Sequence, residues 1–473
     1  MLSLDFNPRR FTDYIFHILL PLLAVALPLL FLSLDLSIAP LIMTSDQRLF
    51  GLFSFCMWTV LFIVGFREIR SRPGISFEKA ALLLLPLLVS FFLLLLIVEY
   101  AVVSWDYEQY EEAYRAVVLE KNPYRSGQYL YPPPFAQVMA YIYEAGEKFP
   151  GPEVLSPWVF VFYIYQCAQF LLGNLAYQLS SRFASHIGFS DLHTKLIVTG
   201  LFLFNFPLIR TLHLNQVNLL ILDSMLILLL LLNRFPALGG AAITVGGLVK
   251  LYPLILGAPL LLMRKWRALV GSIAGGVLVI FLMTDFGRDL TLWRQFIEFT
   301  LAFPVERESS IWVRNTSILS LMRNLNRFAG LPEAAITPLY IAGVLGVFAW
   351  ILLRLYKRER TYALQPPGSA REIHRNSGNL IDFISLSLLI TPSAWDHHFI
   401  TVLPLALWAI ALRGRELPGW VGVGIVCIFA LPPFDIFPFS FLRMFGVIAL
   451  LVLTPPRIHL DLSGVNEEGT AIG

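Results

Sequence analysis

Apolar residues in this chain occur in successive long runs that are separated by short polar segments. Most runs are roughly as long as the 17–25 residues that a helix needs to cross the hydrocarbon core of a bilayer. The pattern therefore predicts membrane-spanning helices, with a short broken hairpin at 237–263. The expected spans are 12–33, 50–66, 80–104, 156–180, 196–211, 217–233, 268–284, 335–355, 380–392, 398–412, 419–432 and 436–454.

Composition supports the same class. Hydrophobic residues make up 57% of the 473 residues and charged residues 14%, against about 45–50% and about 25% in soluble chains. We therefore predict an all-α polytopic integral membrane protein with about 12–14 transmembrane helices. We expect the protein to be embedded in a lipid bilayer. The formal net charge of +3 is too small to indicate a nucleic acid partner.

Basic residues gather in alternate connections between the runs and so predict the topology. The positive-inside rule puts these clusters in the cytoplasm, together with both termini. The long polar segments 105–155 and 285–334 then lie on the outer, periplasmic face of a cell (inner) membrane, and we expect short amphipathic helices in them. The clusters contain Arg9, Arg10, Arg67, Arg70, Arg72, Lys79, Arg264, Lys265, Arg267, Arg354, Lys357, Arg358, Arg360, Arg413, Arg415 and Arg457.

Four parts of the chain follow from this topology. Residues 1–78 form an N-terminal transmembrane hairpin that could be an added module, and 79–415 form the membrane core with both outer loops. A transmembrane pair follows at 416–455, and 456–473 is expected to be a flexible cytoplasmic tail.

The two arms of the hairpin at 237–263 are short, and they meet near Lys250 and Pro253. A lysine at the centre of a bilayer costs about 2.5–3.5 kcal/mol. We therefore expect Lys250 to face a polar cavity near the outer surface.

An acidic residue begins the first outer loop. Asp106, Tyr110, Ala113 and Val117 share one face of a helix by their spacing. A partly buried carboxylate at this place could serve as a general base toward a hydroxyl group. The alternative is an interfacial helix cap or a solvated charge, and the spacing leaves both open.

Three further polar clusters are predicted on the same face. Each also has a purely structural interpretation, as a polar helix corner or as a group that satisfies loose backbone atoms. Arg323 and Arg327, four residues apart, suit either phosphate contact or solvation. The clusters are 391–398 with Trp395, Asp396, His397 and His398; 214–218 with Asn215, Gln216 and Asn218; and Asn315-Thr316-Ser317 followed by Arg323.

The order of these residues resembles the membrane glycosyltransferases of the type-C fold, and most closely glycosyltransferase family 87, which is also catalogued as a domain of unknown function. That group is polyprenol-phosphate-mannose-dependent. The resemblance runs from roughly residue 100 to 415 and implies a type-C-like helical bundle with an outward-facing cavity. Its motifs are Asp106…Tyr110, Asn122-Pro123-Tyr124, Tyr131-Pro132-Pro133, Asn215-Gln216-Val217-Asn218, Lys250…Pro253, Asn315-Thr316-Ser317…Arg323 and Pro392…Trp395-Asp396-His397-His398.

The resemblance implies transfer of a mannose-like hexose from a polyprenyl-phosphate sugar to a glycolipid or glycan acceptor. Asp106 would be the catalytic base, and no cofactor is implied, although a divalent metal is left open. The oligomeric state is left open too. Lys250, His397, His398 and Arg323 are expected at the donor phosphate, and Tyr110, Tyr131, Asn215, Gln216, Asn218, Asn315 and Trp395 at the substrates.

Two features depart from the family pattern. Three expected spans precede the acidic loop where the simplest members have one, and Asn215 stands where glycine is common. The competing class is a multi-span transporter or a flippase for lipid-linked sugars, which the broken hairpin and an intramembrane cation would also suit. A non-catalytic scaffold would not require acidic, basic and imidazole groups on one face.

Overall fold

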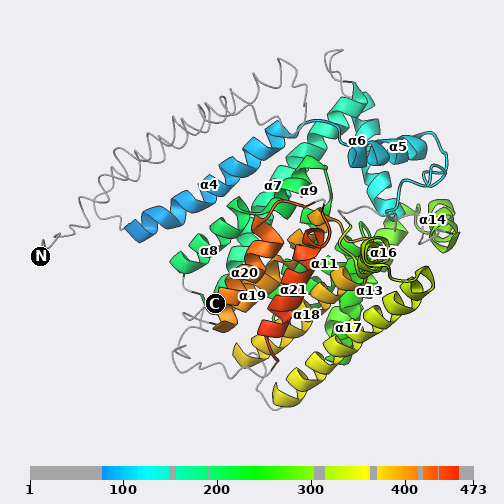
Figure 1. Ribbon diagram of the computed structural model, residues 1–473. Helices are drawn as coiled ribbons and strands as arrows, with labels where there is room; N and C mark the ends of the chain where they lie inside the picture. The colour runs from blue at the N-terminus through cyan, green and yellow to red at the C-terminus, as the bar shows by residue number, and fades with distance from the viewer. Residues whose placement is uncertain are drawn as a thin grey trace, which may run out of the picture. The chain divides into compact units, whose positions relative to one another are not determined.

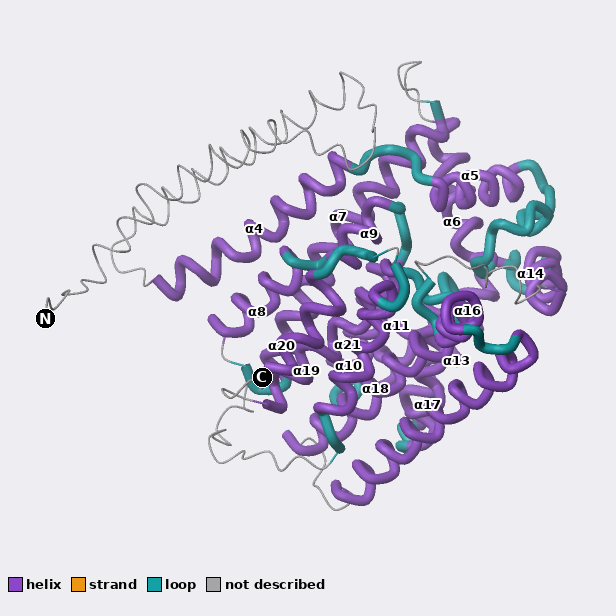
Figure 2. Tube along the Cα trace, viewed as in Figure 1, coloured by secondary structure: helices purple, strands orange, loops and turns teal. Residues whose placement is uncertain are grey.

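A computed structural model describes residues 77–148, 156–189, 191–302, 315–362, 370–413, 419–434 and 436–456. This part of the chain is built of helices (Figure 2), and within it the only β-type pairing is an isolated bridge between Asn315 and Trp395. The predicted all-α class is confirmed. The expected spans 12–33 and 50–66, and nearly all of the predicted segments 1–78 and 456–473, lie outside the described residues.

The chain divides into two compact units, Met1–Ala101 and Val102–Gly473. The described part of the first unit is helix α4, Phe77–Glu99. The second unit contains the remaining helices, coloured cyan to red in Figure 1. They are α5 Trp105–Val118, α6 Pro133–Lys148, α7 Pro157–His186, α8 Asp191–Leu203, α9 Phe206–His213, α10 Asn218–Leu231, α11 Pro236–Gly247, η2 Tyr252–Leu256, α12 Gly257–Leu262, α13 Trp266–Met283, α14 Thr291–Ala302, α16 Ile318–Ala329, α17 Glu333–Tyr362, α18 Ala370–Ile390, η3 Asp396–Val402, α19 Leu403–Arg413, α20 Gly419–Ile425, η4 Val426–Ala430, η5 Phe439–Phe441 and α21 Leu442–Leu453.

Several of these helices suit a bilayer. Among the described residues, α7, α13 and α17 are long and apolar enough to cross one, and six shorter helices of 10–17 residues are apolar as well. The polytopic membrane class is therefore confirmed.

The expected span 196–211 is not one straight helix. The pair Leu192–Leu203 and Phe206–His213 is bent by 52°. Asn205 lies at the break, and its side chain accepts a hydrogen bond from the Leu208 N–H at 2.9 Å. Pro207, one residue into α9, has no N–H to continue a preceding helix, so the chain restarts at this cap.

Small residues bring α11, the first helix of the hairpin, into close contact with α13, which follows the hairpin. A Cβ atom at Gly240 of α11 would overlap the backbone of Ala268, and one at Gly271 of α13 would overlap the backbone of Ala237. Such close approach is typical of helix packing in membranes. As predicted, the hairpin is broken: α11 ends at Gly247, and Lys250 lies in the gap before η2.

The two predicted outer loops do contain short helices, α5 and α6 in the first and α14 and α16 in the second. Helix α5 begins at Ser104, whose hydroxyl accepts a hydrogen bond from the Tyr107 N–H at 3.2 Å. Asp106 and Glu108 lie in its first turn, where negative charge is favourable, and Tyr107, Tyr110 and Tyr114 form its buried face.

Segments predicted to share one side of the membrane do lie together. Lys265, from one basic connection, pairs with Glu372 from the next such loop, with Nζ and Oε1 2.9 Å apart. The polar corners predicted on the other side also meet, as described next. Which side is cytoplasmic stays a prediction.

Candidate active site

The corner between α9 and α10 positions Gln216, around which the other polar residues of the candidate site lie. Asn215 has a φ of +53°, a left-handed conformation that suits asparagine or glycine better than other residues. Asparagine therefore suits this position of the corner. Its side chain accepts a hydrogen bond from Gln166 Nε2 at 2.6 Å and donates one to the Val102 carbonyl at 2.9 Å. The corner is thereby tied to α7 and to the segment before α5, and the following Gln216 is held in one direction.

Lys250 reaches this corner from the hairpin. Its Nζ lies 3.0 Å from Gln216 Oε1, 3.0 Å from Asn218 Oδ1 and 3.3 Å from His398 Nε2. It also lies 5.4 Å from the centre of the Tyr131 ring. Three neutral polar groups surround the ammonium, and its charge also acts on the Asp106 carboxyl group. The predicted polar surroundings of Lys250 are therefore present.

The two histidines have different surroundings. The His398 ring faces Lys250 through Nε2, and its Nδ1 accepts a hydrogen bond from the Trp395 N–H at 3.3 Å. His397 packs edge-to-face on the His398 ring at 4.5 Å, and its carbonyl accepts from Thr211 and Asn218 at 3.2 Å each.

Asp396 forms an ion pair with a residue of α21. Its Oδ1 pairs with Arg443 Nη1 of α21 at 3.1 Å, and both side chains are buried. The Asp396–Arg443 pair anchors the start of η3 to α21.

Asp106 lies on the other side of Gln216. Burial raises the pKa of the Asp106 carboxyl group above its ordinary value. A hydrogen bond with the Gln216 side chain and the charges of Lys250 and Arg210 act in the opposite direction but are smaller. A half-buried carboxylate with a raised pKa is a suitable proton acceptor.

Tyrosines fill the space around Gln216. Tyr110 Oη donates to Tyr131 Oη at 3.0 Å, and Tyr131 Oη lies 3.2 Å from Gln216 Oε1. Tyr110 is only 1% exposed and Tyr131 8%. In this structure they position Gln216. Their predicted contact with a sugar stays a prediction.

Asn315 hydrogen-bonds the turn that precedes His397 and His398. Its side chain donates to the Pro392 carbonyl at 3.1 Å and accepts from the Ala394 N–H at 2.9 Å, and its backbone forms the bridge to Trp395. Asn315 is fully buried, so its side chain acts on the turn before His397. Arg323 lies half-buried on α16 and Trp395 is also half-buried. Their predicted substrate contacts stay predictions.

Two charged residues near the site were not among those predicted. Arg210 of α9 lies close enough to lower the pKa of Asp106, and Arg443 pairs with Asp396. The available signal was a single arginine in an otherwise apolar segment, since such a cation requires an anion or a polar cavity. Among the described residues, no group of three or more His, Cys, Asp or Glu side chains is arranged to hold a metal ion.

The sequence model of glycosyltransferase family 87 matches residues 129–365, half of the chain. The match contains Tyr131, Asn215, Gln216, Asn218, Lys250, Asn315 and Arg323, and Asp106 and the histidines lie outside it. No curated protein matches the chain. The membrane-spanning helices and this match agree with the resemblance noted above and favour a transferase over a transporter, so the chain belongs to glycosyltransferase family 87 and is a membrane glycosyltransferase.

Proposed function

We propose that this glycosyltransferase moves a mannose-like hexose from a polyprenyl-phosphate sugar to a glycolipid or glycan acceptor on the outer face of the cell membrane. One observation carries the proposal. Gln216 Oε1 accepts a hydrogen bond from the Lys250 ammonium at 3.0 Å, and the same side chain acts to lower the pKa of the adjacent Asp106 carboxyl group. A base and a cation therefore lie one side chain apart, as transfer from a phosphate-linked donor requires.

The reaction is a single displacement. An acceptor hydroxyl oxygen forms a bond to the anomeric carbon while the bond from that carbon to the carrier phosphate oxygen breaks. The hydroxyl proton passes to Asp106, and the bonding electrons leave with the phosphate. Attack opposite the leaving group inverts the configuration at the anomeric carbon.

The charges of the site suit this transition state. Negative charge develops on the phosphate, toward which we place Lys250 and the His398 ring, whose nitrogens Nζ and Nε2 lie 3.3 Å apart. Groups fixed before the reaction need no reorganisation, and one such donor is commonly worth about 2.7–4 kcal/mol. His397 and Arg323 complete the proposed phosphate site, and Trp395 is proposed to contact the sugar. The positive-inside pattern supports the outer face.

Transfer of label from a radiolabelled polyprenyl-phosphate hexose tests the function. Purified protein in detergent is incubated with the donor and a crude glycolipid fraction, and products are separated by chromatography. Label is expected in a new glycolipid or glycan with inverted anomeric configuration. Transfer only from a nucleotide sugar, or retention of configuration, would contradict the proposal.

The pH dependence of kcat/KM should report on Asp106. The carboxylate must be ionised to accept a proton, so activity should rise with pH through its pKa and level off above it. Because burial raises this pKa, the acid limb should lie above the pH of about 3.9 that is usual for aspartate. The charge of Lys250 lowers the pKa of Asp106. Replacing Lys250 by Gln should therefore move the acid limb of the kcat/KM profile to still higher pH. An unchanged limb, or a limb at lower pH, would argue against Asp106 as the base.

Sugar transfer is expected to persist in excess EDTA. Lys250 and the neighbouring donors supply positive potential to the leaving phosphate, the task that a divalent ion performs in many other phosphate sites. Initial rates after dialysis against EDTA, with and without added Mg²⁺ or Mn²⁺, measure this. Loss of activity that either metal restores would require a metal in the mechanism.

A further inference from the structure

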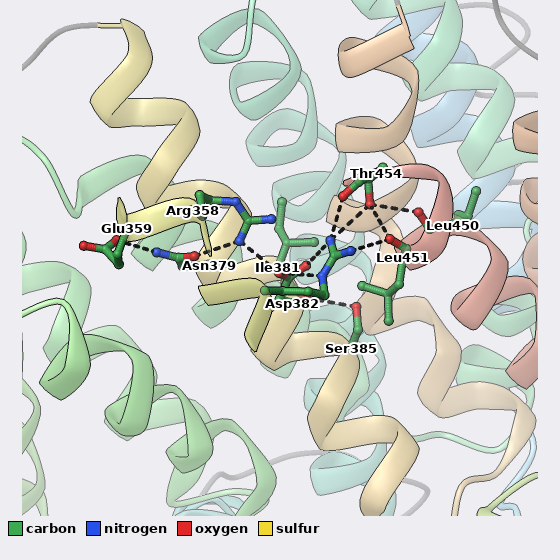
Figure 3. Close-up of polar contacts among 10 residues, drawn as sticks. Arg358, Glu359, Asn379, Ile381, Asp382, Ser385, Leu450, Leu451 and Thr454 are labelled. Carbon is green, nitrogen blue, oxygen red and sulfur yellow. Dashed lines mark hydrogen bonds and ion pairs between the residues drawn. The ribbon is translucent and has the colours of Figure 1, made fainter. Parts of the chain in front are cut away.

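A second charged cluster lies within the helices, away from the candidate active site (Figure 3). Arg354 and Arg358 come from α17, and Asp382 and Asn379 come from α18. All four side chains are buried. From Asn379 to the end of α18 at Ile390 the helix rises by about 17 Å. The cluster is therefore separated from the His397–His398 turn, which follows the end of α18.

All three side-chain nitrogens of Arg354 donate hydrogen bonds. Nε and Nη2, which form one edge of the guanidinium, donate to Asp382 Oδ2 and Oδ1 at 2.9 Å each. The Leu451 and Thr454 carbonyls, at the end of α21, accept its other bonds at 2.6 and 2.7 Å. Arg354 thus stabilises the negative end of a helix and one carboxylate.

Arg358 uses only one of its nitrogens. Its Nη1 donates to Asn379 Oδ1 at 2.7 Å and to Asp382 Oδ2 at 2.9 Å. Its Nε and Nη2 make no hydrogen bond to any described residue. These two atoms form the same guanidinium edge with which Arg354 binds a carboxylate, an edge that fits carboxylate or phosphate oxygens in pairs.

The cluster has an excess of positive charge. Two buried guanidinium groups share the single carboxylate of Asp382. The neighbouring network adds Arg375 and Lys265 opposite Glu359 and Glu372, so it leaves this excess unchanged. A buried charge without a full partner is costly, which makes an added anion favourable.

A cleft opens beside Arg358. The cleft is small, and its lining consists of Arg358, Tyr362, His374, Trp408, Leu412 and the two prolines after α21. The ring of His374 packs at 4.9 Å from Trp408, and its Nδ1 has no hydrogen-bond partner among the described residues. A buried polar atom without a hydrogen-bond partner among the described residues thus belongs to a residue that lines the cleft.

Gly378 makes room for the guanidinium. A Cβ atom at this position would lie 2.8 Å from Arg358 Nε and 3.1 Å from the Trp408 ring. The guanidinium therefore lies close to Gly378 of α18 and Trp408 of α19. A Cβ atom at position 378 would require the guanidinium to shift.

We propose that this cleft binds a phosphate group through the free edge of Arg358, with Gly378 and Trp408 holding that edge in place. The phosphate belongs either to the headgroup of an anionic phospholipid or to a soluble phosphate, and both present the same paired oxygens. The site is separate from the one proposed for sugar transfer, so either proposal can fail alone.

The test measures ligand-induced thermal stabilisation of the purified full-length protein in detergent. One series titrates inorganic phosphate, and another titrates phosphatidylglycerol against phosphatidylcholine. The wild type should show a saturable rise in Tm. A rise with both ligands identifies a soluble phosphate site, and a rise with phosphatidylglycerol alone identifies a lipid headgroup. No saturable rise with either ligand overturns the proposal.

Variants assign the effect to Arg358. Arg358→Gln should weaken binding at least about 10-fold, since one charge-assisted paired contact is lost. Arg360→Gln removes the same charge from an exposed position on the same helix and should bind as the wild type does. Equal binding by the wild type and both variants would refute the assignment.

Two further variants distinguish loss of the binding site from unfolding of the protein. Gly378→Ala keeps the charge and displaces the guanidinium, so it should also weaken binding, and each variant is compared with its own Tm without ligand. Arg358→Lys keeps the charge without the paired edge and should bind more weakly than the wild type. Unchanged binding by both of these folded variants would also overturn the proposal.

Discussion

Asp106→Asn is expected to lower the kcat of sugar transfer by about 10³-fold, within the range of 10²–10⁴ that general base catalysis commonly supplies. The amide keeps the size of the side chain and its place at the start of α5, but it cannot accept the acceptor's proton. A 10³-fold loss corresponds to about 4 kcal/mol of transition-state stabilisation. The measurement is single-turnover transfer from saturating donor.

Glu108→Gln is the matched control for this prediction. Glu108 lies in the same first turn of α5, but its side chain is exposed. Both variants remove one negative charge from the positive end of the same helix, so a general loss of helix stability would affect both alike. Near-normal turnover by Asp106→Asn, or an equal loss in both variants, would exclude Asp106 as the base.

Lys250→Gln is expected to lower kcat by about 10²–10³-fold, the usual effect of removing one preorganised donor at a developing negative charge. Glutamine retains hydrogen bonding toward Gln216 and Asn218 but carries no charge for the leaving phosphate. KM for the donor should rise as well, since the donor carries phosphate charge before the reaction begins. Initial rates over a range of donor concentrations separate the two effects.

Lys121→Gln is the matched control for Lys250. It removes a lysine charge from an exposed position in the loop after α5 and should leave both constants unchanged. A Lys250→Gln enzyme with normal kcat and only a higher KM would mean that the lysine binds the donor without stabilising the leaving group. That result would retain the phosphate site but alter its role.

Much of the site could be predicted because membrane chains restrict where polar groups can lie. Five polar residues of the site each interrupt or border an apolar run, where an unpartnered polar side chain costs free energy. They are Asp106, Lys250, Gln216, Asn218 and His398. The positive-inside pattern then put all five on one side. The structure brings all five to one place, around Gln216.

The division of roles could not be predicted. The sequence presents His397 and His398 as equivalent neighbours, yet one ring faces Lys250 and the other residue anchors through its carbonyl. Asn315 was predicted to contact substrate, and in the structure it holds the turn of Trp395 through Pro392 and Ala394. Hydrogen-bond partners far apart in the chain decide these roles, and a periodic pattern carries no record of them.

The sequence by itself determined that this protein is an all-helical membrane protein, where its hairpin breaks, and which polar residues lie together on one side. It could do so because the cost of polar groups in hydrocarbon acts on each segment separately. Only the tertiary structure decided that Gln216 lies between Asp106 and Lys250 and that Arg443 pairs with Asp396. The same is true of the packing of the Arg358 guanidinium against Gly378. Those outcomes depend on which helices pack together, and packing is set by the shapes of many side chains at once.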